Sequence, residues 1–407
     1  MKNVKIPVYL DYHATTPVDP EVFKTMAPYF TEIFGNAASR NHEFGWTAES
    51  AVEKGRAQVA SLIGATEKEI IFTSGATESN NLALTGVAEM YAEKGNHIIT
   101  SPIEHKAILD TCEALERKGY KISFAEVDTT GQVKPESVAA LITDKTILVS
   151  IMFANNEIGT INKIGEIAKI CKDKGVLFHT DAVQAVGKIP VDVNALGIDL
   201  LSMTGHKIYG PKGVGALYVR RKNPRVRLSP ILHGGGHERG MRSGTLNVPG
   251  IVGFGKACEI ALKNLPTEMP RIRAMRDRLW KEIQDQLDEV YLNGHPTDRL
   301  PNNLNVSFAY VEGESLMMGM KELAVSSGSA CTSASLEPSY VLKALGVGDD
   351  LAHSSIRFSL GRFTTDAEID YTVQKVVATV KKLRDISPLY EMVKEGINLK
   401  TVVWTAH

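Results

Sequence analysis

The chain has 407 residues, of which 43% are hydrophobic and 23% charged, and 46 Lys and Arg residues against 47 Asp and Glu residues give a net charge of −1. This is a globular composition with room for two or three domains, and the charge argues against a protein that holds nucleic acid by bulk electrostatics. Four Cys residues without CxxC spacing exclude a disulfide scaffold and disfavour a structural zinc site. The opening MKNVKIPVYLDY has no apolar leader, and no stretch is long enough to span a membrane, so we expect a cytoplasmic protein.

Short apolar runs alternate with helical patterns from residue 69 onward. Strands are predicted at 69–74, 96–101, 120–127, 146–153, 176–181 and 199–203, with a return strand at 213–219. Helices are predicted at 75–94, 106–118 and 164–174. This alternation predicts an α/β fold with a mostly parallel sheet.

The pattern changes near residue 265. Two prolines in the segment NLPTEMP (264–270) predict a boundary, followed by a charged helix at 271–287 and strands at 303–308 and 355–360. Thr365 and Glu368 form the capping-box pattern that opens a last helix. The second half therefore reads as a smaller α+β domain.

The four cysteines divide into three and one. Cys112, Cys171 and Cys258 lie on apolar helix faces, where a thiol behaves as a small, unreactive hydrophobe. Cys331 lies in SSGSACTSAS, a run of small polar residues that predicts an exposed loop. From this loop alone, Cys331 is either a nucleophile or an incidental surface thiol.

Several polar residues follow directly after predicted strands. Gly75 opens a helix whose first N–H groups, with the Thr77 hydroxyl, are suited to a phosphate. Asp181, His105 and Lys207 also stand at strand carboxyl ends, where α/β sheets bind ligands. Taken singly, they could be a turn or cap Asp, a capping His and a solvated Lys. Together they indicate a pyridoxal-phosphate site in which the lysine forms an imine and the acid pairs with the ring nitrogen.

Arg357 alternates with Ile356, Phe358 and Leu360 and so faces away from the core of its own domain. Capture of a substrate carboxylate and an inter-domain salt bridge are both consistent with this position.

A basic run contains Arg220, Arg221, Lys222, Arg225 and Arg227. It is either a solvated edge or a surface that attracts acidic partners.

Nine segments together resemble the cysteine desulfurases of the class V aminotransferase family. They are residues 9–17 (YLDYHATTP), 72–78 (FTSGATE), 104–106 (EHK), 155–159 (NNEIG), 180–187 (TDAVQAVG), 205–213 (GHKIYGPKG), 233–245 (HGGGHERGMRSGT), 326–340 (SSGSACTSASLEPSY) and 353–362. The resemblance implies pyridoxal-phosphate fold type I. It implies a large domain at 16–265 with a mostly parallel seven-stranded sheet. A small α+β domain would be formed by 1–15 and 266–407, with a mobile Cys331 loop and a C-terminal docking tail.

The same resemblance implies the residues of the site. Lys207 would hold the cofactor covalently, His105 would stack on its ring and act as acid and base, Asp181 would hold the ring nitrogen, and Gln184 the phenolic oxygen. The phosphate would be held by Ala76, Thr77, Thr204, His206 and, across a homodimer, Thr245. Asn156 would contact both cofactor and substrate, and Arg357 the substrate carboxylate.

The implied reaction converts L-cysteine to L-alanine and leaves a persulfide on Cys331. Implied acceptors are an iron–sulfur scaffold protein (IscU-like) and other sulfur acceptors, including those for tRNA thiolation, and Cys331 could also ligate a metal cluster shared with the scaffold. No direct nucleic-acid or membrane partner is expected. Alternatives are a selenocysteine lyase, another aminotransferase-family enzyme, a nitrogenase-dedicated desulfurase, or a non-catalytic scaffold.

Overall fold

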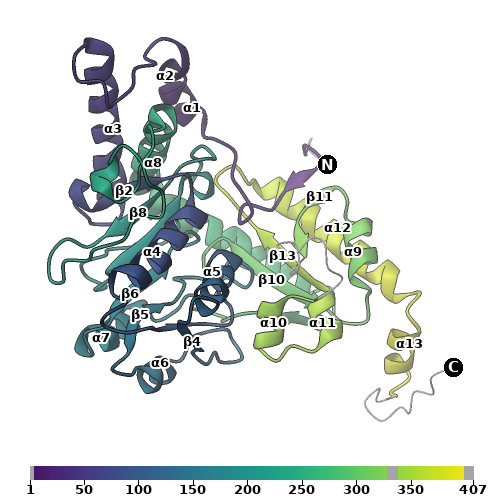
Figure 1. Ribbon diagram of the computed structural model, residues 1–407. Coiled ribbons are helices and arrows are strands. Elements are labelled where there is room, and N and C mark those ends of the chain that lie inside the picture. The colour runs from purple at the N-terminus through teal and green to yellow at the C-terminus, as the bar shows by residue number, and fades with distance from the viewer. Residues whose placement is uncertain (1–3, 328–337, 398–407) are drawn as a thin grey trace.

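Seven strands form the central sheet of the computed structural model, which describes residues 4–327 and 338–397 (Figure 1). In chain order they are β2 (Ile70–Thr73), β3 (His97–Thr100), β4 (Lys121–Phe124), β5 (Thr146–Ser150), β6 (Leu177–Asp181), β7 (Leu200–Thr204) and β8 (Gly215–Val219). The spatial order is β2–β8–β7–β6–β5–β3–β4, and β8 is antiparallel to both of its neighbours while the other pairs are parallel. The predicted mostly parallel sheet with a return strand is confirmed.

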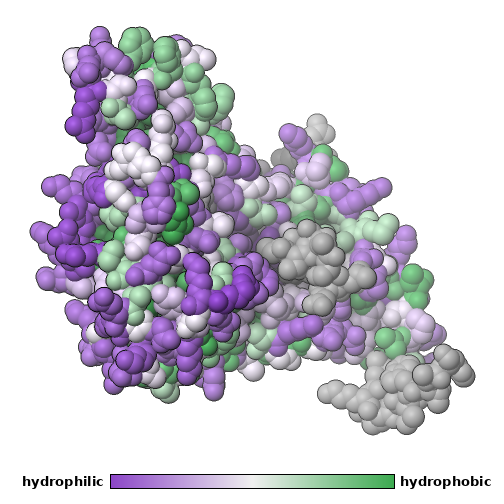
Figure 2. Space-filling view, viewed as in Figure 1, coloured by the Kyte–Doolittle hydropathy of each residue, from purple (hydrophilic) through white to green (hydrophobic). Residues whose placement is uncertain are grey.

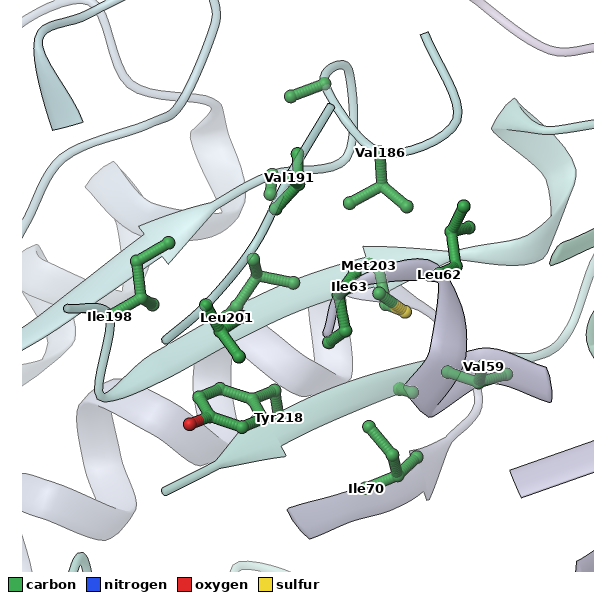
Figure 3. Close-up of a cluster of buried hydrophobic side chains, with 14 of the residues drawn as sticks. Val59, Leu62, Ile63, Ile70, Val186, Val191, Ile198, Leu201, Met203 and Tyr218 are labelled. Carbon is green, nitrogen blue, oxygen red and sulfur yellow. The ribbon is translucent and has the colours of Figure 1, made fainter. Parts of the chain in front are cut away.

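Helices cover both faces of this sheet. Core residues of α3 (Glu43–Leu62), α7 (Ile164–Asp173) and the first half of α8 (Val248–Gln284) pack on one face, and those of α4 (Ala76–Met90) and α5 (Lys106–Glu116) on the other. Figure 3 shows Val59 and Leu62 of α3 in one cluster with Met203 of β7 and Tyr218 of β8. Strands buried on both faces read as continuous apolar runs, which explains why they are recognisable in the sequence.

The remaining helices of this half are short. They are α1 (Pro20–Met26), α2 (Pro28–Thr31) and α6 (Pro135–Leu141), with 3-10 turns η1 (Glu67–Glu69), η2 (Gly205–Lys207) and η3 (Glu238–Gly240).

A second, smaller sheet is built from the C-terminal part of the chain. It has the antiparallel order β12 (Ser326–Ser327), β13 (Ser355–Ser359), β10 (Asn303–Phe308) and β9 (Val290–Leu292). Its helices are α9 (Gly313–Gly319), α10 (Tyr340–Ala344), α11 (Asp349–His353), α12 (Asp366–Arg384) and α13 (Pro388–Lys394). The capping box of Thr365 and Glu368 opens α12 as predicted.

The N-terminus returns to this second half. β1 (Val8–Tyr9) pairs in parallel with β11 (Leu323–Ala324), and Val8 and Leu10 belong to the second hydrophobic core. The chain then crosses to the large sheet, where Thr16 donates its backbone N–H to the His206 carbonyl at 2.9 Å.

The helix predicted to begin at residue 271 begins earlier, because α8 runs without interruption from Val248 to Gln284, through the segment 264–270. The domain boundary expected at this segment stays a prediction. Pro266 and Pro270 lie one turn apart on the exposed side of α8. Each proline leaves the carbonyl four residues earlier without its helical donor. Water can solvate those carbonyls here, since Leu262 is itself exposed. The buried residues of this helix pass from the first hydrophobic core, which contains Ala261, to the second, which contains Met269.

The three helical cysteines are buried as predicted. Burial raises the pKa of Cys112 in α5 to about 12, and the pKa values of Cys171 and Cys258 are raised for the same reason. These thiols are therefore protonated and unreactive near neutral pH. In the described parts of the chain, no helix combines the length and apolar character needed to span a bilayer.

Candidate active site

A cavity of about 700 Å³ lies at the carboxyl ends of the parallel strands, between the two sheets. All but two of the predicted site residues line it: Ala76, Thr77, His105, Asn156, Asp181, Gln184, Thr204, His206, Lys207 and Arg357. Thr245 is exposed in the loop before α8 and does not line it. Cys331 lies outside the described residues, although Ser326, five positions earlier, lines the cavity.

One end of the cavity has the features of an anion cradle. Helix α4 begins there, and its N-cap residue, Gly75, makes no side-chain hydrogen bond to the first turn. Its first backbone N–H groups are therefore available to a phosphate. The strand facing this helix start also carries a required glycine, because a Cβ on Gly215 would lie 2.7 Å from the Gly75 Cα.

His206 adds a neutral donor to this end. Its Nδ1 lies 3.1 Å from the Thr15 hydroxyl. Burial, followed by the nearby charges of Lys207, Lys212 and Lys188, lowers the pKa of His206 to about 4. The imidazole is therefore uncharged at neutral pH, and its Nε2 can donate when Nδ1 accepts from Thr15.

Asp181 is held at the end of β6 with its carboxylate fixed on both sides. Asn80 of α4 donates from Nδ2 to Oδ2 at 2.7 Å, and the Val183 backbone N–H donates to Oδ1 at 3.1 Å. Asn80 was not predicted as a site residue. The available signal was a polar side chain one turn after Ala76 on an otherwise apolar helix face.

Lys207 follows β7 in η2 and points at the N-terminal segment. Its Nζ donates to the carbonyl oxygens of His13 and Ala14, the latter at 2.7 Å. The sequence pattern placed Lys207 at a strand end but gave no sign of the two carbonyl groups that orient its amine.

His105 caps α5 from the end of the β3 loop. Its Nδ1 accepts the Ala107 backbone N–H at 3.1 Å, so the neutral ring carries its proton on Nε2. The adjacent Glu104 is fully buried, and burial raises its pKa to about 8. Its Oε1 accepts from the Ser101 hydroxyl at 2.7 Å and the Met152 N–H at 2.8 Å, which ties the loop of His105 to the end of β5.

Arg357 enters the cavity from β13. Its Nη2 pairs with Asp11 at 2.8 Å and its Nη1 donates to the Asn156 carbonyl at 2.9 Å. The guanidinium thus lies in the cavity. Its ion pair stays within the residues expected to form the small domain, whereas its hydrogen bond to Asn156 reaches the large one. Capture of a substrate carboxylate stays a prediction. Asp11 and His13, which also line the cavity, were not predicted as site residues.

Four buried polar atoms around the cavity have no hydrogen-bond partner among the described residues. They are Asn80 Oδ1, Asn156 Oδ1, His13 Nε2 and Arg357 Nε. Buried polar atoms in native proteins are normally paired, so a cluster of this kind matches a polar ligand. With an anion cradle, a fixed carboxylate, an oriented amine and a guanidinium, these residues fit pyridoxal phosphate together with an amino acid.

Within residues 4–327 and 338–397, no cluster of three or more His, Cys, Asp or Glu side chains is placed to hold a metal ion. The suggested cluster ligand Cys331 is not among those residues.

Comparison with known proteins identifies the family. Residues 8–372 match the aminotransferase class-V family. The chain is 60% identical over 401 residues to the cysteine desulfurase IscS of Anaeromyxobacter dehalogenans, covering 98% of this chain and 99% of the relative. Two solved structures are also similar. One is a NifS-like protein (TM-score 0.85, 40% identity, covering 92% of this chain and all of the other). The other is SspA in complex with cysteine (TM-score 0.78, 36% identity, covering 88% of this chain and all of the other). The chain therefore belongs to the aminotransferase class-V family.

Proposed function

We propose that this protein is a pyridoxal-phosphate-dependent cysteine desulfurase, which converts L-cysteine to L-alanine and carries the released sulfur as a persulfide on Cys331. The observation that carries the proposal is the cavity in which Lys207, Asp181, His105 and Arg357 converge from two sheets. Full-length relatives at 60% identity that bear this activity in their names support the same conclusion.

The cofactor supplies an electron sink for the carbanion formed when the substrate loses its α-proton. Asp181, which Asn80 holds by a hydrogen bond, would pair with the ring nitrogen. Arg357 would bind the substrate carboxylate through Nε, which has no partner among the described residues. A carboxylate accepts from the Arg357 side, whereas Asn156 reaches it through its amide nitrogen.

Two groups move protons in this scheme. The Lys207 amine would hold the cofactor covalently, and as a free amine it would accept the α-proton of the substrate. His105 would stack on the ring and present its Nε2–H, because its Nδ1 accepts the Ala107 N–H.

Sulfur transfer uses the thiolate of Cys331. Its Sγ forms a bond to the substrate sulfur, the bond between that sulfur and the substrate Cβ breaks, and the electron pair left on carbon is protonated to give alanine. The three helical thiols are unsuited to this step, because burial keeps them protonated.

Incubation of the purified protein with L-cysteine and dithiothreitol tests the proposal. Wild type is expected to release alanine and sulfide in equal amounts. Cys331→Ser is expected to keep the absorption band of the lysine-bound cofactor but to form no persulfide, whereas Lys207→Ala should lose the band. Cys112→Ala, which removes a buried thiol, is the matched control and should keep both. An aminotransferase would be indifferent to Cys331→Ser, and a non-catalytic scaffold would show no band.

The sulfur is delivered to acceptor proteins, among which we place an iron–sulfur scaffold protein and the acceptors for tRNA thiolation. A selenocysteine lyase or a nitrogenase-dedicated desulfurase would share the same cavity. Lys222, Arg225 and Arg227 are exposed and can attract acidic acceptors. Arg220 does not belong to that surface, since it pairs with the buried Asp199 at 3.3 Å.

A further inference from the structure

Lys188 is a buried lysine that the mechanism above does not use. It is 6% exposed, and its Nζ donates to the Gln184 side-chain oxygen at 2.9 Å. Burial, followed by the charges of Lys207 and Arg357, lowers the pKa of Lys188 well below its ordinary value. A lysine in such a place costs free energy that an apolar side chain of similar length would not cost.

The partner of Lys188, Gln184, lines the cavity with its amide held at both ends. The amide oxygen accepts from Lys188, and the amide nitrogen donates to the His13 carbonyl at 3.0 Å. The same carbonyl accepts from the Lys207 amine. A flipped amide would set N–H against the lysine and oxygen against a carbonyl, so both contacts require the same orientation.

This orientation has a chemical consequence inside the cavity. An amide nitrogen carries two N–H groups, and the His13 carbonyl accepts one of them. The second is left as a donor for a ligand in the cavity that Gln184 lines. The opposite orientation would present an oxygen lone pair, which repels an acceptor such as the phenolic oxygen of pyridoxal phosphate.

We infer that Lys188 is a positioning residue that fixes the Gln184 amide as a hydrogen-bond donor to the phenolic oxygen of the cofactor. The inference rests on the proposed function, because it requires pyridoxal phosphate in this cavity. Lys188 itself acts only through Gln184.

The test compares cofactor-loaded wild type with Lys188→Met, Gln184→Leu and the double variant. Each protein is freed of cofactor and titrated with pyridoxal phosphate, and the absorption maximum of the loaded form is recorded. Lys188→Met is expected to weaken binding about tenfold, as for loss of one well-placed hydrogen bond. It should also shift the absorption maximum in the same direction as Gln184→Leu. In the Gln184→Leu background, the lysine change should have no further effect.

Melting temperature separates positioning from a structural role. Lys188→Met removes a buried amine, so its melting temperature is expected to lie within about 2 °C of wild type or above it. The matched control Lys169→Met removes an exposed lysine paired with Asp173, and should change neither binding nor absorption.

Additive effects of the two changes, or a Lys188→Met spectrum identical to that of wild type, would overturn the inference. If Lys188→Met does not fold, Gln184→Leu decides instead. An absorption maximum unchanged in Gln184→Leu would show that Gln184 does not contact the cofactor, and Lys188 could then not act through it. Failure of wild type to bind pyridoxal phosphate would refute the proposed function, which is a separate result.

Discussion

Arg357 holds a charge that is almost completely buried, and its carboxylate partner Asp11 comes from the far end of the sequence. The side chain of Arg357 is 4% exposed and that of Asp11 is 19% exposed. A guanidinium in this environment needs a compensating charge, and Asp11 supplies it in the absence of a substrate carboxylate. The pair thus holds the Arg357 guanidinium in place in the cavity.

Asp11→Asn should therefore lower the free energy of unfolding more than the same substitution in an exposed ion pair. We expect the unfolding free energy of the cofactor-free protein to fall by about 2 kcal/mol, because an amide keeps an acceptor for Nη2 but not the charge. Asp173→Asn breaks the exposed pair with Lys169 and should cost less than about 0.5 kcal/mol. Urea denaturation measures both, and equal costs would mean that Asp11 does not compensate Arg357.

At the scale of elements, a buried histidine joins three neighbouring strands. His179 on β6 contacts the Ser150 hydroxyl on β5 through Nδ1 at 2.8 Å and the Ser202 hydroxyl on β7 through Nε2 at 3.0 Å. Burial lowers its pKa to about 3. His179 lies two residues before Asp181 on the same strand, so these two hydrogen bonds fix the strand that carries the Asp181 carboxylate.

This histidine makes stability depend on pH in a defined window. The unfolded chain binds a proton at His179 below about pH 6.5, whereas the folded protein does not bind it until about pH 3. Stability is therefore lost as pH falls through this range, at about 1.4 kcal/mol per pH unit for one group. His179→Gln should be less stable than wild type at pH 7, and the difference should narrow at pH 6 and again at pH 5. Urea unfolding at these three values measures it, and a constant difference would exclude the titration of His179.

The strands and turns that carry the cavity residues were predictable where the sequence pattern is local. Lys207, Asp181 and His105 each follow an apolar strand, and parallel strands bring their carboxyl ends to one edge. The continuity of α8 was not predictable, because only tertiary packing decides that Pro266 and Pro270 face water.

The supporting residues of the site were missed for a similar reason. Asn80 binds Asp181 and Asp11 binds Arg357 across large distances in sequence. Lys188 binds Gln184 within one buried turn. A polar residue on an apolar face could have indicated Asn80. No pattern in one sequence pairs residue 11 with residue 357.

At the scale of the molecule, the two hydrophobic cores are tied together by Arg362. Its Nη1 pairs with Asp19 at 2.7 Å, its Nε pairs with Glu268 of α8 at 2.9 Å, and its guanidinium lies over the Tyr209 ring. The cavity between the sheets thus has walls that are fixed relative to each other by buried ion pairs, not by chain connection alone.

A different part of the molecule carries an uncovered apolar surface. Five aromatic side chains on α1, α2, the following loop and the start of α3 are more than half exposed: Phe23, Phe30, Phe34, Phe44 and Trp46. They lie in the arm at the top of Figure 1, where Figure 2 shows hydrophobic residues gathered. Clustered exposed aromatic residues mark interaction sites. Helix α3 packs along α8, which begins just after the exposed Thr245.

We therefore expect this arm to be the contact between two copies of the chain, with Thr245 reaching the partner's cavity. Light scattering should give twice the chain mass of 44.4 kDa for wild type. Phe34→Asp places a charge in the patch and should shift the protein toward monomer, and the monomer should bind pyridoxal phosphate more weakly because the partner's threonine is lost. Phe124→Asp, the matched control, makes the same change at an exposed phenylalanine on the edge strand β4 and should leave the dimer intact. A dimer that survives Phe34→Asp but not Phe124→Asp would place the contact at the other end of the sheet.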